Sequence, residues 1–348
     1  MRNQTVDALR GMAALMVCVF HVVGTAGIGN GVDDVWSYGR MGVPLFFVIS
    51  GFIVPLSMDL AGHRIGDYFR FIARRMVRLE PPYFATIAFI LISGVALAHF
   101  PQLNTSHPPY TVINVLLHIG YVNAFVGQPW LSGPFWTLAI EFQYYVVIGL
   151  LFPILVSSRT AGLAMLGVFA GLSVVSAGYV EFLPAHLSVF GTGILTFMFW
   201  TKRVDLNTFC VGIAILCAVV WWTLGPERAI TCLLASTAIA ISWVPASSLF
   251  SRVGMISYSL YLVHVPIGMR FVKLSERVFP GSPWLASAIA LAACFGAALL
   301  LWYFVEEWAK KQSKKIDYGS KARRAAPNIV KAPISDAEPQ APLLPSEG

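Results

Sequence analysis

The sequence contains few charged residues. Only 12% of its 348 residues are Asp, Glu, Lys or Arg, while 57% are hydrophobic. A soluble domain carries about 25% charged residues, so this composition excludes a soluble globular protein of this size. The hydrophobic residues occur in runs long enough to cross a bilayer, and the runs show little amphipathic periodicity. We therefore predict an all-α fold, a polytopic bundle of transmembrane helices.

Motifs of several common protein classes are also missing. The five cysteines lie in apolar runs and form no C-x-x-C pair, which excludes a disulfide framework and gives no sign of a metal site. The net charge of +7 comes mostly from basic residues beside the apolar runs, where anionic lipid head groups or an anionic cytosolic ligand would meet them. We therefore expect membrane lipids as partners and no nucleic acid. The sequence leaves a homo-oligomer open.

Charge decides how many spans to expect. With ten spans and a cytoplasmic N-terminus, 19 Lys and Arg lie inside and 5 outside, but an eleventh span at 111–126 gives 11 inside and 13 outside. Cytoplasmic loops carry an excess of Lys and Arg. We therefore expect ten spans, both termini in the cytoplasm, and 111–126 as a re-entrant or interfacial element on the outer side. The spans are 8–28, 41–60, 83–100, 136–156, 161–180, 185–200, 207–224, 229–245, 254–271 and 285–305.

The predicted organisation is a membrane domain, residues 1–307, followed by a tail. Residues 308–348 begin with clustered lysines and then become rich in Pro, Ala and acidic residues. Such a segment lacks the apolar content that a folded core needs, so we predict a disordered cytoplasmic extension. The expected location is the inner (plasma) membrane, as a multi-pass protein.

The first apolar run, DALRGMAALMVCVFH, has an arginine at its edge and a histidine inside. Arg10 and His21 are eleven residues apart, or about 16 Å along a helix. If Arg10 lies at one surface of the hydrocarbon layer, His21 lies near its middle, where an ionisable side chain indicates a functional site. The alternative is that His21 only hydrogen-bonds a neighbouring helix, while Arg10 anchors the span at the interface.

Two further spans place polar groups at a similar depth. In FWTLAIEFQYYVV, Glu141 follows the interfacial Trp136 by five residues, or about 7 Å. We predict that His21 and Glu141 form a base and its orienting carboxylate; alternatively, Glu141 binds a proton, a cation or the substrate. Ser50 of the second span is a candidate substrate-binding residue. Small residues at such positions usually serve close helix packing, and no G-x-S-x-G surrounds Ser50 to favour a nucleophile.

The ninth span, ISYSLYLVHVPI, brings two tyrosines to nearly the same side and a histidine to mid-depth. Tyr258 and His264 are therefore candidate substrate-binding residues. A purely structural role for either, or direct chemistry for His264, is the alternative. Pro266 is expected to open the helix backbone near His264.

The segment HRIGDYFRFIARRMVRLEPPY has apolar residues at helical spacing with arginines between them. It predicts an amphipathic basic helix in the cytoplasmic interface, ended by Pro81-Pro82. Arg75 and Arg78 are three residues apart on one helix face, so their guanidinium groups can bind the same polyanion. Arg10 is expected at the same depth, at the cytoplasmic surface of the membrane. Phosphate recognition is the functional interpretation. A topology determinant and lipid anchor is the alternative.

Five segments together resemble the acyltransferase 3 family of polytopic membrane O-acyltransferases, which includes exopolysaccharide and O-antigen acetyltransferases. In the family's order they are VDALRGMAALMVCVFH, GVPLFFVISGFIV, FRFIARRMVRLEPPY, WTLAIEFQYY and ISYSLYLVHVP. The resemblance implies transfer of an acyl group, usually acetyl, from cytosolic acyl-CoA to a hydroxyl of a polysaccharide, lipid-linked sugar or glycolipid. Glu141 matches a glutamate that follows Trp-Ser-Leu by three, and Thr137 replaces that serine here but keeps the hydroxyl.

The same resemblance implies roles for the other candidates. Arg10 and His21 match the family's basic residue and its essential histidine, and Arg75-x-x-Arg78 matches the motif associated with the acyl donor. His21 would then be the catalytic base or the acyl carrier. Acyl-CoA, expected to be acetyl-CoA, is a co-substrate, and we expect no permanently bound cofactor.

A proton-coupled transporter or flippase of a lipid-linked sugar is the alternative function. His21, Glu141 and His264 would then be proton or substrate sites. Transporters commonly have inverted repeats and paired broken helices, and neither is evident in this sequence. A passive scaffold would leave three ionisable groups at mid-depth unexplained.

Overall fold

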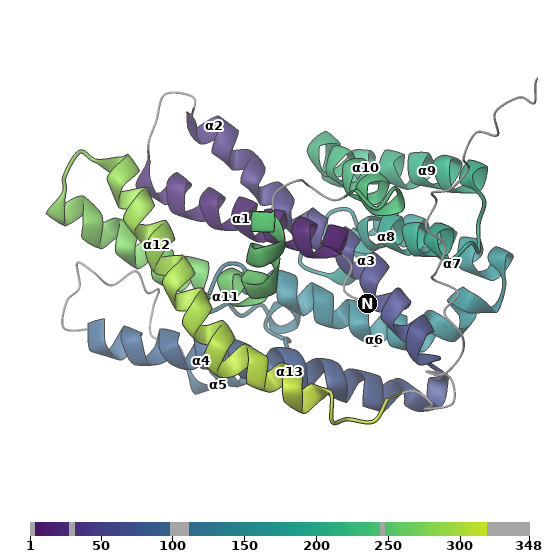
Figure 1. The fold of residues 1–348 in the computed structure, drawn as a ribbon, viewed down its shortest axis with the longest axis horizontal. Coiled ribbons are helices and arrows are strands. Elements are labelled where there is room, and N and C mark those ends of the chain that lie inside the picture. The colour runs from purple at the N-terminus through teal and green to yellow at the C-terminus, as the bar shows by residue number, and fades with distance from the viewer. Residues whose placement is uncertain (1–3, 28–31, 98–110, 244–247, 319–348) are drawn as a thin grey trace, which may run out of the picture.

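The computed structural model describes residues 4–27, 32–97, 111–243 and 248–318, which are mostly helical (Figure 1). No strand occurs among these residues, so the predicted all-α bundle is confirmed. The helices are α1 (Gln4–Ala26), α2 (Val32–Ser37), α3 (Gly42–Ala61), α4 (Tyr68–Leu97), α5 (Val112–Leu117), α6 (Phe135–Ser157), α7 (Arg159–Val175), α8 (Leu187–Trp200), α9 (Leu206–Leu224), α10 (Pro226–Ala240), α11 (Ser248–Val278), α12 (Pro283–Leu301) and α13 (Glu307–Ser313).

Each of the ten predicted spans coincides with a helix. Within the described residues, eight helices are long and apolar enough to cross a membrane. The other two, α7 and α10, have 17 and 15 residues. The segment 111–126 contains α5, a helix of only 6 residues, which is too short to cross a bilayer. The side of the membrane on which each terminus lies stays a prediction.

The prediction that Pro81-Pro82 ends the basic helix is wrong. Helix α4 continues through both prolines, so the basic segment and the span after it form one 30-residue helix. Proline removes a backbone donor, but inside a bundle neighbouring side chains can satisfy the backbone around it. Side chains also bond to backbone carbonyls beside the two prolines: the Tyr258 hydroxyl donates to the Leu79 carbonyl at 2.8 Å, and Thr86 donates to the Pro82 carbonyl at 2.9 Å. Likewise, α11 is continuous through Pro266.

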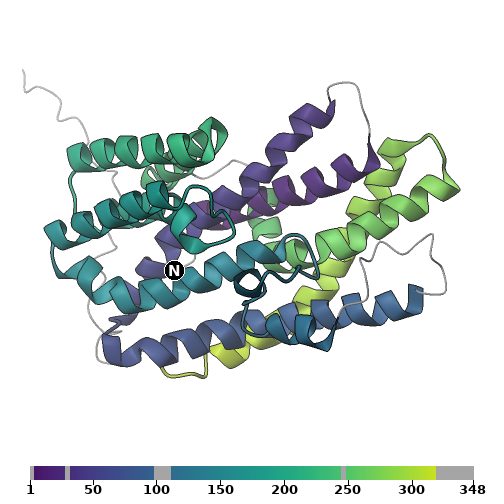
Figure 2. The ribbon, with the colours of Figure 1, turned by 180° about the vertical axis from the view of Figure 1, so that it is seen from behind.

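Two buried clusters form the core, one around α3, α6, α8 and α9 and the other around α1, α4, α11 and α12. Within them α1 packs along α11 and α3 along α8 (Figures 1 and 2). Glycines allow both approaches. A Cβ on Gly254 of α11 would lie 2.0 Å from the Asp7 carbonyl oxygen of α1. A Cβ on Gly193 of α8 would lie 2.1 Å from the Val48 carbonyl oxygen of α3. Small residues at these crossings let the helix backbones touch.

The first residues of the expected tail are ordered. Helix α13 packs beside α4 (Figure 1), and Tyr318 is buried. The His63 Nε2–H donates to the Gly149 carbonyl at 2.9 Å, so His63 Nδ1 accepts from the Tyr318 hydroxyl at 2.8 Å. Burial lowers the pKa of His63, which keeps the ring neutral for this role. Residues 319–348 lie outside the described residues, and their disorder stays a prediction.

We expect Gly254→Ala and Gly193→Ala to destabilise the protein, because each new methyl group would overlap a backbone oxygen. Overpacking of this kind costs about 1–3 kcal/mol, which corresponds to a Tm lower by about 2–10 °C. Thermal unfolding of the purified protein in detergent measures it. Gly171→Ala in α7 is the matched control, since a Cβ there meets nothing within 4 Å. Equal Tm values for all three variants would contradict the close packing.

Candidate functional site

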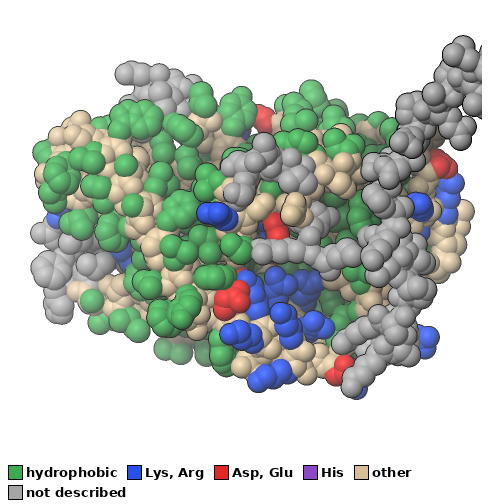
Figure 3. Space-filling view, viewed as in Figure 1, with side chains coloured by type: hydrophobic (Ala, Val, Ile, Leu, Met, Phe, Trp, Pro, Cys, Tyr) green, Lys and Arg blue, Asp and Glu red, His purple; other side chains and the backbone are tan. Residues whose placement is uncertain are grey.

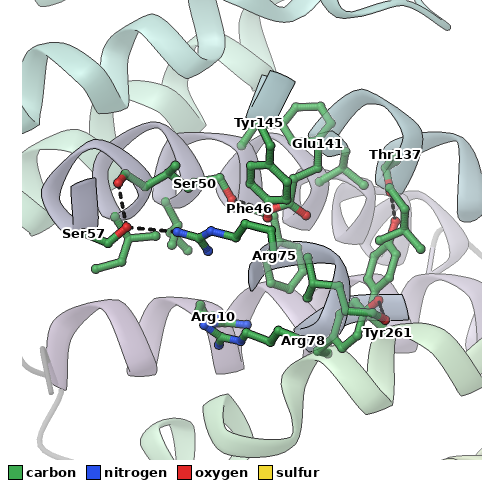
Figure 4. A pocket seen from close by; sticks show the side chains of 18 residues that line it. Arg10, Phe46, Ser50, Ser57, Arg75, Arg78, Thr137, Glu141, Tyr145 and Tyr261 are labelled. Carbon is green, nitrogen blue, oxygen red and sulfur yellow. Dashed lines mark hydrogen bonds between the residues drawn. The ribbon is translucent and has the colours of Figure 1, made fainter. Parts of the chain in front are cut away.

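Six of the eight predicted site residues line one cavity of about 160 Å³ between α1, α3, α4, α6 and α11 (Figure 4). Arginines lie on one side of this cavity, and the polar groups of α6 and α11 lie on the other. We call it the central cavity. The six residues are Arg10, Ser50, Arg75, Arg78, Glu141 and Tyr258.

The three arginines of the central cavity have few partners in the protein. Arg75 donates to the Ser57 hydroxyl at 3.0 Å, and its guanidinium group lies over the ring of Tyr145 at 5.2 Å. Among the described residues, the guanidinium groups of Arg10 and Arg78 have neither a hydrogen-bond partner nor an ion-pair partner. A guanidinium group inside a protein is costly unless an anion or water satisfies it. Chemically, these three side chains can bind an anionic group.

Glu141 is held by hydroxyl groups and is not paired with His21. Its Oε1 accepts from the Ser50 hydroxyl at 2.6 Å and from the Tyr145 hydroxyl at 2.5 Å. The predicted His21–Glu141 pair is therefore not formed, because the two side chains belong to different cavities. Tyr145 was not among the predicted site residues, although its position four residues after Glu141 on one helix face could have indicated it.

A larger cavity of about 560 Å³ adjoins the central cavity on the basic side. We call it the basic opening. It shares Ser57, Arg75 and Arg78 with the central cavity. Arg74 of α4 and two lysines from the C-terminal segment, Lys310 and Lys314, complete it. Figure 3 shows Lys and Arg side chains gathered where α4 and α13 lie in Figure 1. The lysines were missed because this segment was expected to be disordered.

His21 lies in a third cavity, of about 350 Å³, which we call the histidine cavity. It shares Val43, Phe47, Thr137 and Tyr261 with the central cavity. The hydroxyl groups of Thr137 and Tyr261 hydrogen-bond each other at 2.5 Å, so this pair stands on the boundary between the two cavities. The three cavities thus form a series, with common walls, from the basic opening to His21.

Hydrogen bonds determine which tautomer His21 and His264 each adopt in the neutral form. His264 Nδ1–H donates to the Tyr261 carbonyl at 2.7 Å, which leaves its Nε2 as an acceptor. The Nδ1–H of His21 faces that nitrogen at 3.3 Å and the Val17 carbonyl at 3.0 Å. His21 Nε2 therefore keeps its lone pair.

The surroundings of His264 do not favour the predicted role of contacting the substrate. The side chain is fully buried, and both of its ring nitrogens are already engaged. It belongs to the walls of none of the three cavities. This arrangement is typical of a residue that orients a base.

The chain matches proteins of known family. The acyltransferase domain profile covers residues 3–303. Nodulation protein 10 of Rhizobium leguminosarum bv. viciae is 24% identical, with 88% of this chain and 92% of that protein aligned. The putative membrane-bound transacylase BcsY of Komagataeibacter xylinus is 26% identical, with 94% and 86% aligned. The putative peptidoglycan O-acetyltransferase YrhL of Bacillus subtilis (strain 168) is 29% identical over 40% of this chain and 22% of its own length.

No solved structure matches the chain. The family profile nevertheless extends from the first helix to the end of the last long span, which confirms the resemblance found in the five sequence segments. The chain therefore belongs to the acyltransferase 3 family, and it is a multi-pass membrane O-acyltransferase.

Proposed function

We propose that the protein transfers an acyl group, most simply acetyl, from acyl-CoA to a hydroxyl of a saccharide acceptor, with His21 at the reacting atoms. The observation that carries this proposal is the series of cavities with common walls, from the basic opening through the central cavity to His21. The family membership favours this enzyme over a transporter or flippase. The name of YrhL, a putative peptidoglycan O-acetyltransferase, supports a saccharide as the acceptor.

Acyl-CoA suits the basic opening and the central cavity. Its phosphate groups would bind the guanidinium groups and the Lys314 ammonium group at the opening, where charge-assisted hydrogen bonds are strong. Its long pantetheine arm would extend into the central cavity and bring the thioester toward Tyr261 and Thr137. Since acyl-CoA is cytosolic, this assignment places the basic opening on the cytoplasmic side of the inner membrane. That orientation agrees with the excess of Lys and Arg on this side.

His21 would serve as the general base. Its free Nε2 takes the proton of the acceptor hydroxyl while the hydroxyl oxygen attacks the thioester carbonyl carbon. The carbon–sulfur bond breaks, the carbon–oxygen ester bond forms, and the proton passes from His21 to the sulfur of CoA. His264 Nε2 accepts a hydrogen bond from His21 Nδ1–H. This hydrogen bond stabilises the positive charge that His21 carries after it takes the proton and before it gives the proton to sulfur. The same free Nε2 would also allow His21 to carry the acyl group itself.

We expect His21→Ala to lower the rate of acyl transfer by at least about 100-fold, because general bases contribute about 10²–10⁴-fold. The measurement is transfer of label from radiolabelled acetyl-CoA to the glycan and glycolipid fraction of membranes that contain the protein. Membrane insertion and Tm should match those of the wild type, because the side chain lines a cavity. Undiminished transfer by a correctly inserted His21→Ala protein would rule out His21 as base or carrier.

Arg75→Ala and Arg78→Ala should each raise the Kd for acetyl-CoA by about 10-fold or more. Hydrogen bonds to charged groups contribute about 1.5–3 kcal/mol, and every 1.4 kcal/mol is about tenfold in affinity. Equilibrium binding to the purified protein measures the effect. Arg159→Ala is the matched control, because Arg159 is an exposed arginine paired with Asp205 at 2.8 Å. If both central-cavity variants bind acetyl-CoA as the control does, these arginines serve another purpose.

A further inference from the structure

The histidine cavity has positive charges of its own. Arg40, from the turn before α3, and Arg228, from the first turn of α10, both line it. No Asp or Glu occurs among the described residues of its wall. The three arginines of the central cavity are not part of this wall. The charge beside His21 is therefore separate from the charge proposed to bind CoA.

Nearby groups neutralise this charge only in part. Glu227 approaches Arg40 at 3.7 Å, with the two side chains 33% and 48% exposed, a distance too long for a strong hydrogen bond. Arg228 donates from Nη1 to the Leu224 carbonyl, a neutral acceptor that fixes its position. One carboxylate thus faces two guanidinium groups. The remaining N–H donors suit a phosphate or carboxylate group, which arginine binds through paired hydrogen bonds.

Part of the wall of the histidine cavity is aromatic. Trp136 and His186 lie with ring centroids 6.0 Å apart, and Phe47 packs 5.3 Å from His186. His186 Nε2–H donates to the Val180 carbonyl at 2.8 Å, so this ring is held in place as part of the wall. Large aromatic rings offer an apolar face with a polar edge, a surface against which a sugar ring can pack. Charge, aromatic wall and base therefore meet in one cavity.

We propose that the acceptor is an anionic saccharide, whose phosphate or carboxylate group binds Arg40 and Arg228 while one of its hydroxyl groups lies at His21. This inference rests on the proposed function, because it takes the acceptor hydroxyl to react beside His21. It adds the chemical class of the acceptor: a sugar phosphate or a sugar acid in preference to a neutral sugar.

Equilibrium binding to the full-length protein in phosphatidylcholine nanodiscs tests the proposal. The probes are glucose 1-phosphate, glucuronic acid, glucose and inorganic phosphate. At least one anionic sugar should bind about 10-fold or more tightly than both glucose and inorganic phosphate. Arg228→Gln and Arg40→Gln should each weaken that binding by several-fold or more. Arg228→Lys should keep part of it, because the charge stays while the paired hydrogen bonds are lost. Arg159→Gln should change nothing.

Four results would overturn the proposal. The first two are that glucose, or inorganic phosphate, binds as tightly as the anionic sugars. The other two are anionic-sugar binding that survives both glutamine substitutions, and loss of that binding when phosphatidylglycerol is added to the nanodiscs. The last result would mean that Arg40 and Arg228 bind lipid head groups. None of the probes contains CoA or a thioester. If the sugar-binding experiment fails, the tests of His21, Arg75 and Arg78 are therefore unaffected. If those tests fail, the sugar-binding experiment still shows whether Arg40 and Arg228 bind an anionic sugar.

Discussion

An ionisable side chain inside a bundle of membrane helices persists only where another group, water or a ligand satisfies it. Two carboxylates of this protein are satisfied internally. Glu141 accepts from two hydroxyl groups, and Glu306 accepts from Ser259 and pairs with Lys310 at 3.0 Å. Arg10 and Arg78, by contrast, border the central cavity without such a partner among the described residues. This contrast separates the charges that stabilise the fold from those available to a substrate.

The close packing of α1 on α11 is what brings the two histidines together. Gly254 lets the backbone of α11 approach α1 to a distance at which a Cβ would overlap the Asp7 carbonyl. Ten residues further along the same helix, His264 Nε2 then reaches His21 Nδ1 at 3.3 Å. The tautomer of His21, and with it the free lone pair on Nε2, therefore depends on a contact between backbones nearly three helical turns away.

Local sequence patterns predicted the helices well because length and apolarity are properties of each segment alone. Spacing along one helix also placed Arg75 and Arg78 on a common face. The partner of His21 could not be predicted in this way. The sequence predicted that His21 and Glu141 lie at a similar depth in the membrane. Whether they pair also depends on which helices are neighbours and on how each helix is rotated about its axis. Tertiary contacts likewise carry α4 through Pro81-Pro82 and order the C-terminal segment as far as Tyr318.

The boundary between the central and histidine cavities has a physical purpose under the proposed function. If the saccharide acceptor enters the histidine cavity from the side of the membrane opposite the basic opening, a continuous water path through the cavities would also conduct ions. At this boundary the side chains of Thr137 and Tyr261 join α6 and α11 by a hydrogen bond between their hydroxyl groups. A serine or a threonine at position 137 supplies that hydroxyl equally well. The thioester and the acceptor can then meet at one narrow point, with His21 on the acceptor's side of it.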